Sequence, residues 1–354
     1  MIKADYPILT NTTYLNTAYV GLMSRKLAAF RREQEEIYVI EGGDHYKIKA
    51  YKDLESMHQN FAHFFGLSAA RCFGVSNFSS GLRTALSFLS KQNKVLLIEE
   101  DYPSLRAAFF EAGIEAVQLS MQPNIEEVIA QKLETERITI LALSIIQYTT
   151  GLLISQEFLK QIKQEYPELI IIGDGTQFLG AHNFHFDESP FDLVVASGYK
   201  WLLAGFGNGL VLCSKFFVSK THRTPQEIRA VFFQGHFDIL AMASLDFAIK
   251  SLKENNFDAL IQSKTALAEA ASKQLTALEF IPLWVSEREK HSAIFNIKGG
   301  EKLFQFLWKK NIRTVQRGSG VRVSFHFYNT LHDLEYLIES LEEFKKLNSH
   351  LSFN

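Results

Sequence analysis

The sequence has few cysteines and prolines, no excess of charge of either sign, and no long apolar run. Its 354 residues include 2 cysteines and 7 prolines, and 37 Lys plus Arg against 39 Asp plus Glu leave a net charge of −2. Without surplus positive charge, no surface is expected to grip a nucleic-acid backbone. Without a stretch of about 20 apolar residues, no helix is expected to cross a membrane.

The two cysteines, Cys72 and Cys213, each lie inside an apolar run. They can be a reactive thiol or a disulfide, but free cysteine is commonly buried as a small apolar side chain, and we favour that interpretation. The N-terminal sequence shows neither an apolar signal region nor a lipidation motif. We therefore expect a cytoplasmic protein, stabilised by its core without disulfides or structural metal.

Short apolar runs alternate with amphipathic segments along most of the chain. Two helices are expected first, at 24–40 and 51–65. Continuously apolar runs then predict strands buried on both faces, and amphipathic stretches between the first four runs predict helices. This alternation is typical of an α/β domain with a mainly parallel sheet. The expected strands are 95–99, 114–120, 138–144, 168–174, 192–197 and 209–214, and the expected helices are 103–112, 124–135 and 155–166.

The pattern changes after about residue 235. Two long helices are expected at 237–254 and 256–277, and a shorter section of strands and helices closes the chain. We predict a large domain over 1–240, whose first residues pack on the small domain, and a connecting helix with a small C-terminal domain over 241–354. The expected elements of that section are strands at 292–298 and 321–325 and helices at 300–309 and 331–346.

The residues that follow the apolar runs are candidates for a site, because ligands in open α/β sheets bind beyond the carboxyl ends of the strands. One run ends in Asp174 and another ends in Ser197, with Lys200 three residues later. In apolar surroundings the pKa of a lysine falls, and the neutral amine can condense with an aldehyde. Taken alone, such a lysine can equally be a solvated turn residue.

The spacing of these residues resembles the class V aminotransferases of the type I pyridoxal-phosphate fold. Asp174, Gln177, Ser197 and Lys200 follow that family's Asp-x-x-Gln and Ser-x-x-Lys elements. Further stretches resemble, in family order, its opening segment, phosphate loop, ring-stacking loop, next strand end and C-terminal arginine strand. They are YLNTAYVGLMSR (14–25), NFSSGLRTAL (77–86), EEDYPS (99–104), SIIQYTTG (144–151) and RGSGVRVSFHFYNT (317–330).

The resemblance implies a pyridoxal 5'-phosphate cofactor and a role for each matched residue. Lys200 would hold the cofactor as a Schiff base and then act as general base and acid. Asp174 would keep the pyridine nitrogen protonated, so that the ring accepts electrons from the substrate. Gln177 and Gln147 would lie near the phenolic oxygen, and Tyr102 would stack on the ring. Each also has a plainer interpretation, as a surface polar residue or a helix start.

The resemblance also implies a homodimer that binds the cofactor phosphate at the start of a helix. Backbone N–H groups and the helix dipole attract phosphate there, although a plain N-cap serine explains the same sequence. His236 replaces the threonine that the second subunit usually lends, or is an ordinary polar residue. The expected phosphate ligands are Ser79, Ser80, Gly81, Ser197, Tyr199 and His236.

Arg322 is the expected clamp for the substrate carboxylate, because its planar fork makes two parallel hydrogen bonds. Arg317 competes for that role, and Tyr19 is expected near the substrate. No metal site is expected, since His182 and His185 lie in an irregular stretch without ligand spacing and are predicted on a surface loop.

The chain is similar to the cysteine desulfurase and isopenicillin N epimerase-like group of the family, but it lacks the desulfurase cysteine. Desulfurases need a thiolate shortly before the arginine strand, where this chain reads RGSGVR. We therefore predict an aminotransferase acting on amino and 2-oxo acids. An epimerase or lyase of the same fold is the first alternative, and a non-catalytic cofactor-binding protein is the second.

Overall fold

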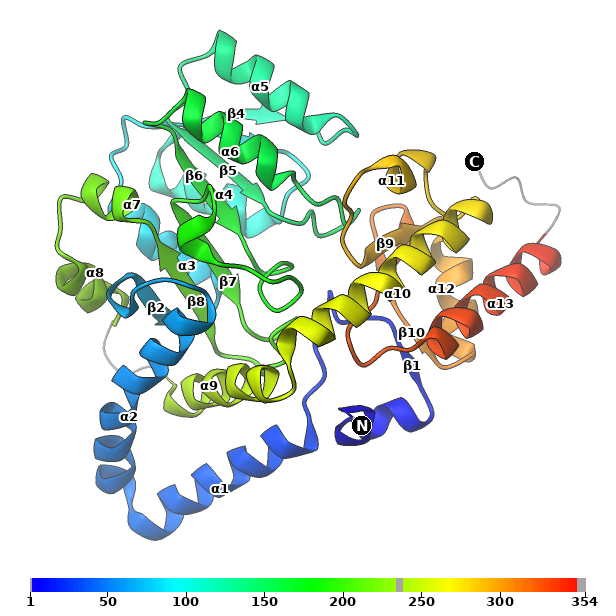
Figure 1. Cartoon of the computed structure of the whole chain (residues 1–354), viewed down its shortest axis with the longest axis horizontal. Helices are drawn as coiled ribbons and strands as arrows, with labels where there is room; N and C mark the ends of the chain where they lie inside the picture. The colour runs from blue at the N-terminus through cyan, green and yellow to red at the C-terminus, as the bar shows by residue number, and fades with distance from the viewer. Residues whose placement is uncertain (1, 234–237, 349–354) are drawn as a thin grey trace.

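A seven-stranded sheet lies within the larger part of the computed structural model, which describes residues 2–233 and 238–348 (Figure 1). The strand order is β2-β8-β7-β6-β5-β3-β4. Strand β8 runs antiparallel to both of its neighbours, and the other adjacent strands are parallel. The strands are β2 (Cys72–Val75), β3 (Lys94–Ile98), β4 (Glu115–Leu119), β5 (Ile140–Ser144), β6 (Ile170–Asp174), β7 (Leu193–Ser197) and β8 (Gly209–Cys213).

The central strands are buried on both faces, which is why they are apolar at nearly every position. In β5, Leu141 and Leu143 join the core cluster on one side of the sheet, whereas Ile140 and Ala142 join the cluster on the other. Alternate residues therefore serve opposite layers, as the two-residue period of a strand requires. The helices of this part are α3 (Phe78–Leu86), α4 (Pro103–Ala112), α5 (Ile125–Thr135), α6 (Gln156–Glu165), α7 (Lys215–Lys220) and α8 (Pro225–Phe232).

Two N-terminal helices, α1 (Arg25–Glu41) and α2 (Gly43–Phe64), form an arm that extends from the sheet (Figure 1). They meet at Gly42, whose φ of 85° suits glycine. Later in the chain, helix α9 (Ile239–Glu254) is followed by α10 (Phe257–Ala277). The side chain of Asn256 caps the start of α10. Short 3-10 helices lie at η1 (Ile2–Asp5), η2 (Pro7–Thr10), η3 (Ala69–Arg71) and η4 (Phe186–Glu188).

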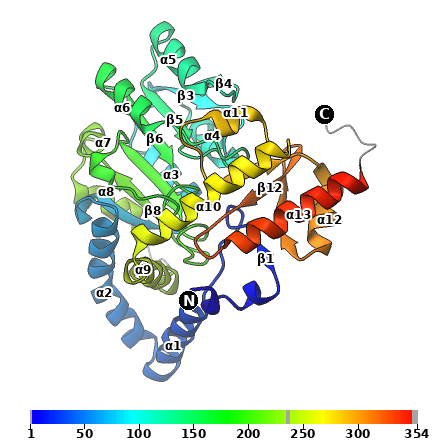
Figure 2. The same cartoon turned by 45° about the vertical axis from the view of Figure 1, so that its right-hand side comes forward.

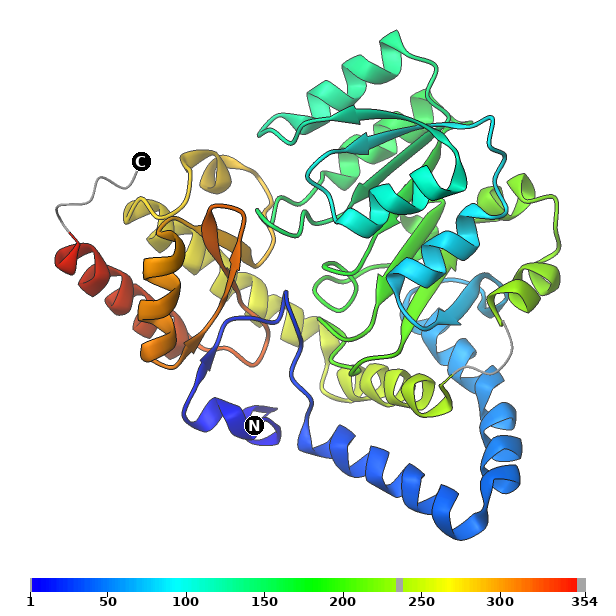
Figure 3. The same cartoon turned by 180° about the vertical axis from the view of Figure 1, so that it is seen from behind.

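Helix α10 crosses to a smaller C-terminal unit, seen from two further sides in Figures 2 and 3. A three-stranded antiparallel sheet in the order β11-β12-β9 forms its centre, and β1, near the N-terminus, pairs in parallel with β10. The elements are β1 (Thr13–Tyr14), β9 (Ile294–Ile297), β10 (Ile312–Arg313), β11 (Val315–Arg317), β12 (Gly320–Ser324), α11 (Leu283–Glu287), α12 (Gly300–Lys309) and α13 (Leu331–Leu347).

The predicted fold class is confirmed: a mainly parallel α/β sheet carries a smaller α/β unit at the C-terminus. Both cysteines are free and fully buried, as favoured. Among the described residues no helix combines the length and the apolar character that crossing a bilayer would take. His182 lies outside the helices and strands and is half-buried, with its ring stacked on Phe178 at 5.1 Å between centroids.

Candidate active site

The carboxyl ends of the parallel strands bring the predicted residues to one edge of the sheet. Ser144 and Asp174 end β5 and β6 and lie side by side in register. Ser197 ends the next strand, β7, and Lys200 follows it in a tight loop. The backbone N–H of Gly21 donates to the Tyr199 carbonyl at 2.9 Å and holds this loop from the N-terminal side.

Lys200 is 8% exposed, and its amine lies beneath two tyrosines. The distances from Nζ to the ring centroids are 5.9 Å for Tyr102 and 5.6 Å for Tyr199. Burial, together with the positive charge of Arg322, lowers the lysine pKa to about 7, and the Asp174 carboxylate only partly opposes this. A large share of the amine is therefore uncharged at neutral pH, which is the form that attacks an aldehyde.

Asp174 presents a buried carboxylate at the end of β6. Its Oδ1 accepts the Thr176 N–H at 2.8 Å. Burial raises its pKa, and the hydrogen bonds from Thr176 act in the opposite direction. In the described part of the chain no Lys, Arg or His forms an ion pair with it. A carboxylate in this state suits a protonated ring nitrogen of a ligand.

The start of α3 lies beside the end of β7. The Phe78 N–H donates to Ser197 Oγ at 2.9 Å, and Asn77 caps the helix by accepting the Ser80 N–H at 2.9 Å. A Cβ on Gly81 would lie 3.0 Å from three valine methyl carbons, so only glycine lets the helix come this close to the sheet. The Ser79 N–H has no acceptor in the described residues, and it can bind an anion at this helix start.

The two tyrosines near Lys200 differ in their surroundings. Tyr102 begins α4 and meets Phe78 and Tyr148 edge-on, with centroid distances of 6.1 Å and 5.8 Å. The Tyr199 ring stacks on Phe206, and burial raises the Tyr199 pKa to about 12. Tyr102 therefore borders the space above the lysine, and the Tyr199 phenol stays neutral and can donate a hydrogen bond.

The two predicted glutamines are largely engaged by the protein itself. Gln177 donates from Nε2 to the Ala18 carbonyl at 2.8 Å and accepts the Trp201 indole N–H at 2.7 Å. Gln147 donates to the Glu100 carbonyl at 2.8 Å and accepts the Thr149 N–H at 2.8 Å. Each glutamine keeps one amide hydrogen for a ligand. A structural role, as a tie between segments, is already visible for both.

Arg322 stands on β12 with its guanidinium almost completely buried. Its Nη1 donates to the Tyr148 carbonyl at 2.5 Å, whereas Nε has no partner among the described residues. Burial and the nearby Arg317 lower the Arg322 pKa to about 9, so the group is still charged at neutral pH. A buried, charged N–H without an acceptor costs free energy, and an anionic ligand would satisfy it.

The loop that Arg322 contacts is fixed by the C-terminal sheet. Gly151 has φ of 80°, and a Cβ there would lie 2.0 Å from the Ile294 carbonyl oxygen. The Ser292 hydroxyl donates to the Gly151 carbonyl at 2.6 Å, and Asn296 donates to the Thr149 carbonyl at 3.4 Å. Residues 147–151 are thus held between the two units of the chain, directly beside the arginine.

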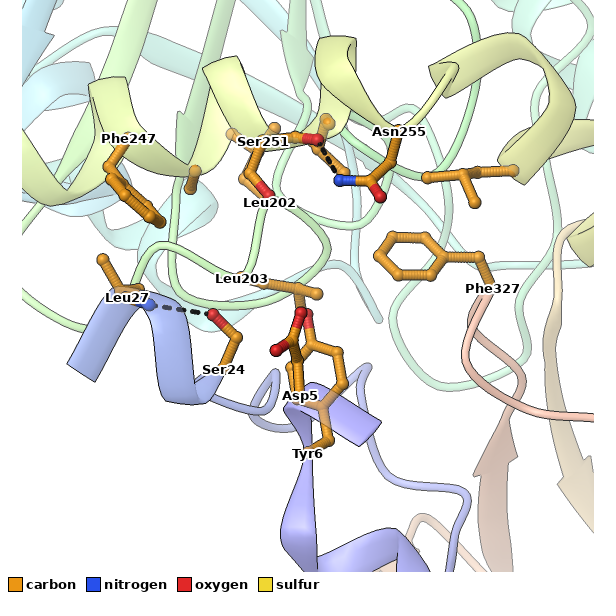
Figure 4. A pocket seen from close by; sticks show the side chains of 13 residues that line it. Asp5, Tyr6, Ser24, Leu27, Leu202, Leu203, Phe247, Ser251, Asn255 and Phe327 are labelled. Atoms are coloured by element: carbon orange, nitrogen blue, oxygen red, sulfur yellow. Dashed lines mark hydrogen bonds between the residues drawn. The ribbon is translucent and has the colours of Figure 1, made fainter. Parts of the chain in front are cut away.

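The remaining two predicted residues are Tyr19 and His236. Tyr19 is half-exposed and lies against Arg317, whose guanidinium carbon is 5.2 Å from the ring centroid. His236 lies outside the described residues. The close-up in Figure 4 shows a separate pocket between the N-terminal segment and α9, and its 30 Å³ has room for about one water molecule, so a cofactor does not fit there.

Asp101 is a buried acid that the residue-by-residue prediction missed. It is 3% exposed, its Oδ2 accepts the Ser144 N–H at 2.9 Å, and its Oδ1 has no partner in the described residues. Burial, with the Asp174 charge as a smaller cause, raises its pKa to about 7. The rule that sites follow strand ends could have found it, since Asp101 comes shortly after β3.

Lys264 of α10 is a buried base with no acidic partner in the described residues. Its Nζ donates to the Ala181 carbonyl and lies 5.8 Å from the centroid of the Trp201 ring. Burial lowers its pKa to about 7. Lys264 thus contacts Trp201, the residue that follows Lys200 in the chain. The sequence offered no signal for it, because Lys264 sits in an ordinary amphipathic helix.

Comparison with known proteins now places the chain in a family. The model of the family described as aminotransferase class V matches residues 27–337, and the chain belongs to that family. The curated relative "Probable cysteine desulfurase" of Ureaplasma parvum serovar 3 (strain ATCC 700970) is 20% identical over 219 residues. That match covers 53% of this chain and 54% of the relative, so the chain spans about half of the relative's length.

Solved structures share the fold. A structure of C-DES with glycine linked covalently to its pyridoxal-phosphate cofactor has a TM-score of 0.84 at 15% identity, covering 96% of this chain and 98% of the other. A second, described as the cystine C–S lyase C-DES with its product cysteine persulfide, has a TM-score of 0.83 at 15% identity. The match covers 95% of this chain and 98% of the other. The cysteine desulfurase of Thermococcus onnurineus NA1 has a TM-score of 0.80 at 16% identity, and the match covers 98% of this chain and 97% of the other.

Pyridoxal phosphate is the cofactor of the class V family, as the sequence predicted, and the site suits it. Asp174 is a buried carboxylate that forms no ion pair within residues 2–233 and 238–348, which suits a protonated pyridine nitrogen. The start of α3 offers an N–H and the Ser197 hydroxyl where a phosphate would sit. Lys200 supplies an amine with a depressed pKa.

Proposed function

We propose that the protein is a pyridoxal-phosphate-dependent aminotransferase that moves an amino group between an α-amino acid and a 2-oxo acid. The observation that carries this proposal is the buried Lys200 amine, which is partly uncharged at neutral pH because its pKa is about 7, and on which the charges of Asp174 and Arg322 both act. Arg322 Nε has no partner among the described residues. This arrangement supports proton transfer at the α-carbon of a bound amino acid.

In this proposal each side chain has one task. The cofactor, when bound, supplies the electron sink that makes the substrate α-proton removable. Lys200 Nζ accepts that proton as a general base and later donates it as a general acid. Asp174 keeps the ring nitrogen protonated, and Tyr102 covers one side of the site. Arg322 fixes the substrate carboxylate and so orients the bond to be broken.

Chemistry that uses a protein thiol is disfavoured by where the cysteines lie. Cys213 pairs with Leu193, the first residue of β7, whereas the site begins at Ser197, the last residue of that strand. Cys72 opens β2 at the same far edge of the sheet. Burial raises the pKa of Cys72 to about 12 and also raises that of Cys213. Neither thiol can be a thiolate next to the substrate.

A lyase that uses no thiol of its own is the second candidate, with an epimerase beside it. The C-DES neighbours favour the lyase, since that protein is described as a cystine C–S lyase. All three reactions begin with the same proton removal by Lys200. They differ in which bond of the substrate then changes, and this depends on how Arg322 and its surroundings orient the substrate.

An amino-donor screen of the purified holoenzyme separates these activities. An aminotransferase should transfer the amino group to an added 2-oxo acid, a lyase should release ammonia or sulfide without one, and an epimerase should change only the handedness of the donor. Borohydride reduction followed by mass mapping should place the cofactor adduct on Lys200. A protein that shows none of these activities while it binds the cofactor would be the non-catalytic alternative.

Replacing Arg322 with lysine should raise KM for the amino donor at least about tenfold, because the bidentate contact to the carboxylate is lost. Steady-state kinetics of Arg322→Lys measure this. Arg313→Lys is the matched control, because Arg313 lies over the Trp308 ring at 3.8 Å and outside the site. An unchanged KM in Arg322→Lys would contradict the assignment of the clamp.

We also propose that the protein is a homodimer in the cytoplasm, since family members are commonly dimeric. Large side chains around the site are exposed in the single chain, with Phe206 at 65% and Tyr19 at 47%. A second subunit would cover them. Analytical ultracentrifugation at micromolar concentration should show a dimer, and a monomer would contradict this part of the proposal.

A further inference from the structure

We propose that the substrate carries two acidic groups, with its α-carboxylate on Arg322 and a second carboxylate, or an acid of similar charge, on Arg317. The inference rests on the proposed function, because it concerns the same site. It names the substrate class as acidic amino acids and their 2-oxo partners.

The hairpin of β11 and β12 places both arginines on one face. Val315 pairs with Arg322, and Arg317 pairs with Gly320. Residues directly opposite in an antiparallel pair point to the same side of the sheet, and so do residues two apart on one strand. Arg317 and Arg322 are therefore diagonal neighbours, roughly 7–8 Å apart in the backbone. That face also carries Asn296, which donates to the 147–151 loop beside the site.

Neither guanidinium has an acidic partner in the described parts of the chain. The contacts of Arg317 are a weak hydrogen bond to the Gln316 carbonyl at 3.4 Å and the Tyr19 ring. Arg322 has one backbone acceptor and an unpartnered Nε. Two cations without acids on one face repel each other, and a ligand with two negative charges would remove that repulsion.

The positive charge of both arginines reaches Lys200. Arg322 and, less strongly, Arg317 lower the lysine pKa, and Arg317 also lowers that of Arg322. The groups that raise the Arg322 pKa are the hydroxyl groups of Tyr148, Tyr199 and Tyr19, and none of these three is a carboxylate. The Asp174 carboxylate opposes them at Lys200, and in the proposed function it pairs with the ring nitrogen of the cofactor.

The difference in burial between the two arginines indicates which of them binds the α-carboxylate and which binds the second acid. Arg322 is 2% exposed on the central strand of its sheet, next to the residues that react. Arg317 is half-buried at the end of the edge strand β11, just before the turn, and leans on the half-exposed Tyr19. The inner arginine suits the carboxylate next to the reacting carbon, and the outer arginine suits the far end of the side chain.

Binding of unreactive acids to the holoenzyme tests the inference without turnover. Isothermal titration calorimetry would compare succinate, which has two carboxylates, with propionate, which has one. We expect wild type to bind succinate at least about tenfold more tightly, because a charge-assisted contact is added. Arg317→Gln should remove that difference and leave propionate binding within about twofold. Arg322→Gln should weaken both acids.

Two further variants serve as controls for net charge and for folding. Arg313→Gln removes a charge from the neighbouring strand β10 and should behave like wild type, which excludes a general effect of net charge. If Arg317→Gln does not fold, Arg317→Lys, which keeps the charge but loses the fork, should show an intermediate preference. Melting temperatures of all variants report whether the fold is intact.

Two results would overturn the inference. Equal weakening of succinate and propionate in Arg317→Gln would mean that Arg317 shares the α-carboxylate site. No change for either acid would mean that Arg317 lies outside the substrate site. The test is separate from the proposed function: an Arg317-dependent preference without amino transfer leaves the second acid site standing, whereas amino transfer without that preference overturns only this inference.

Discussion

Burial and two nearby guanidinium groups set the basicity of Lys200, the residue at the centre of the site. Burial lowers its pKa most, and the repulsion from Arg322 and, more weakly, Arg317 adds to this, so that the pKa lies at about 7, well below the ordinary 10.5. The neutral form therefore prevails above pH 7. A side chain that is a weak nucleophile in water becomes an available one at physiological pH without any change in its covalent structure.

Cofactor capture by the apoenzyme should follow this titration. The rate should rise from pH 6 to 8 and level off above pH 8, because the uncharged amine reacts. Arg322→Gln removes one cation, so the lysine pKa rises and the midpoint should move to higher pH. Stopped-flow absorbance after mixing apoenzyme with pyridoxal phosphate measures the curve. A midpoint near 10 in wild type would refute this account.

At the scale of elements, the 147–151 loop joins the two units of the chain. It carries the carbonyl that Arg322 uses, and β9 and its flanks hold it through Ser292 and Asn296. The positive φ of Gly151 and its contact with the Ile294 carbonyl leave no room for a side chain. The backbone carbonyl that Arg322 contacts therefore lies in a loop whose shape depends on Gly151, in a different unit of the chain.

Replacing Gly151 with alanine should lower the free energy of unfolding by several kcal/mol and raise KM for the amino donor. Gly113→Ala is the matched control, because Gly113 also has a positive φ, of 70°, but open space around it, its nearest neighbour being a Lys91 side-chain atom at 3.9 Å. That change should cost only about 1–2 kcal/mol. Urea unfolding and kinetics measure both, and equal losses in the two variants would contradict the argument.

Most long elements could be predicted, because their periodicity is local. The break at Lys253–Asn256 is an example, since Asn256 does cap α10. The very short strands β1, β10 and β11 were missed, because two or three residues carry no period. Strand β2 was missed as well, because its run of four residues next to a turn gives little signal. These strands exist only through their distant partners.

The sequence predicted which residues form the candidate site better than it predicted the contacts between their side chains. Strand ends and family order led to Lys200, Asp174 and Arg322, and in the structure the charges of Asp174 and Arg322 both act on the Lys200 amine. The pairing of Gln177 with Trp201, or the use of the Tyr148 carbonyl by Arg322, depends on the angle between segments far apart in the chain. No local pattern records such an angle, and the same holds for the buried Lys264.

For the whole molecule, cofactor binding should be visible as stability. A ligand that binds only the folded state raises the free energy of unfolding by RT ln(1 + [L]/Kd). Removing pyridoxal phosphate should therefore lower the melting temperature by several degrees, and adding it back should restore the value. Pyridoxal, which lacks the phosphate, should restore less, because it cannot bind the N–H groups at the start of α3. Equal melting temperatures with and without cofactor would contradict the site.

The contact between the two ends of the chain has a consequence for synthesis. The Thr13 hydroxyl donates to Asp333, 320 residues further on, and β1 pairs with β10 at a similar separation. Ribosomes add about 5–20 residues per second, so the N-terminal segment waits roughly 15–60 s before its partners emerge. The central sheet can form during that time, and strand β1, although it is made before the sheet, pairs only after the sheet has formed.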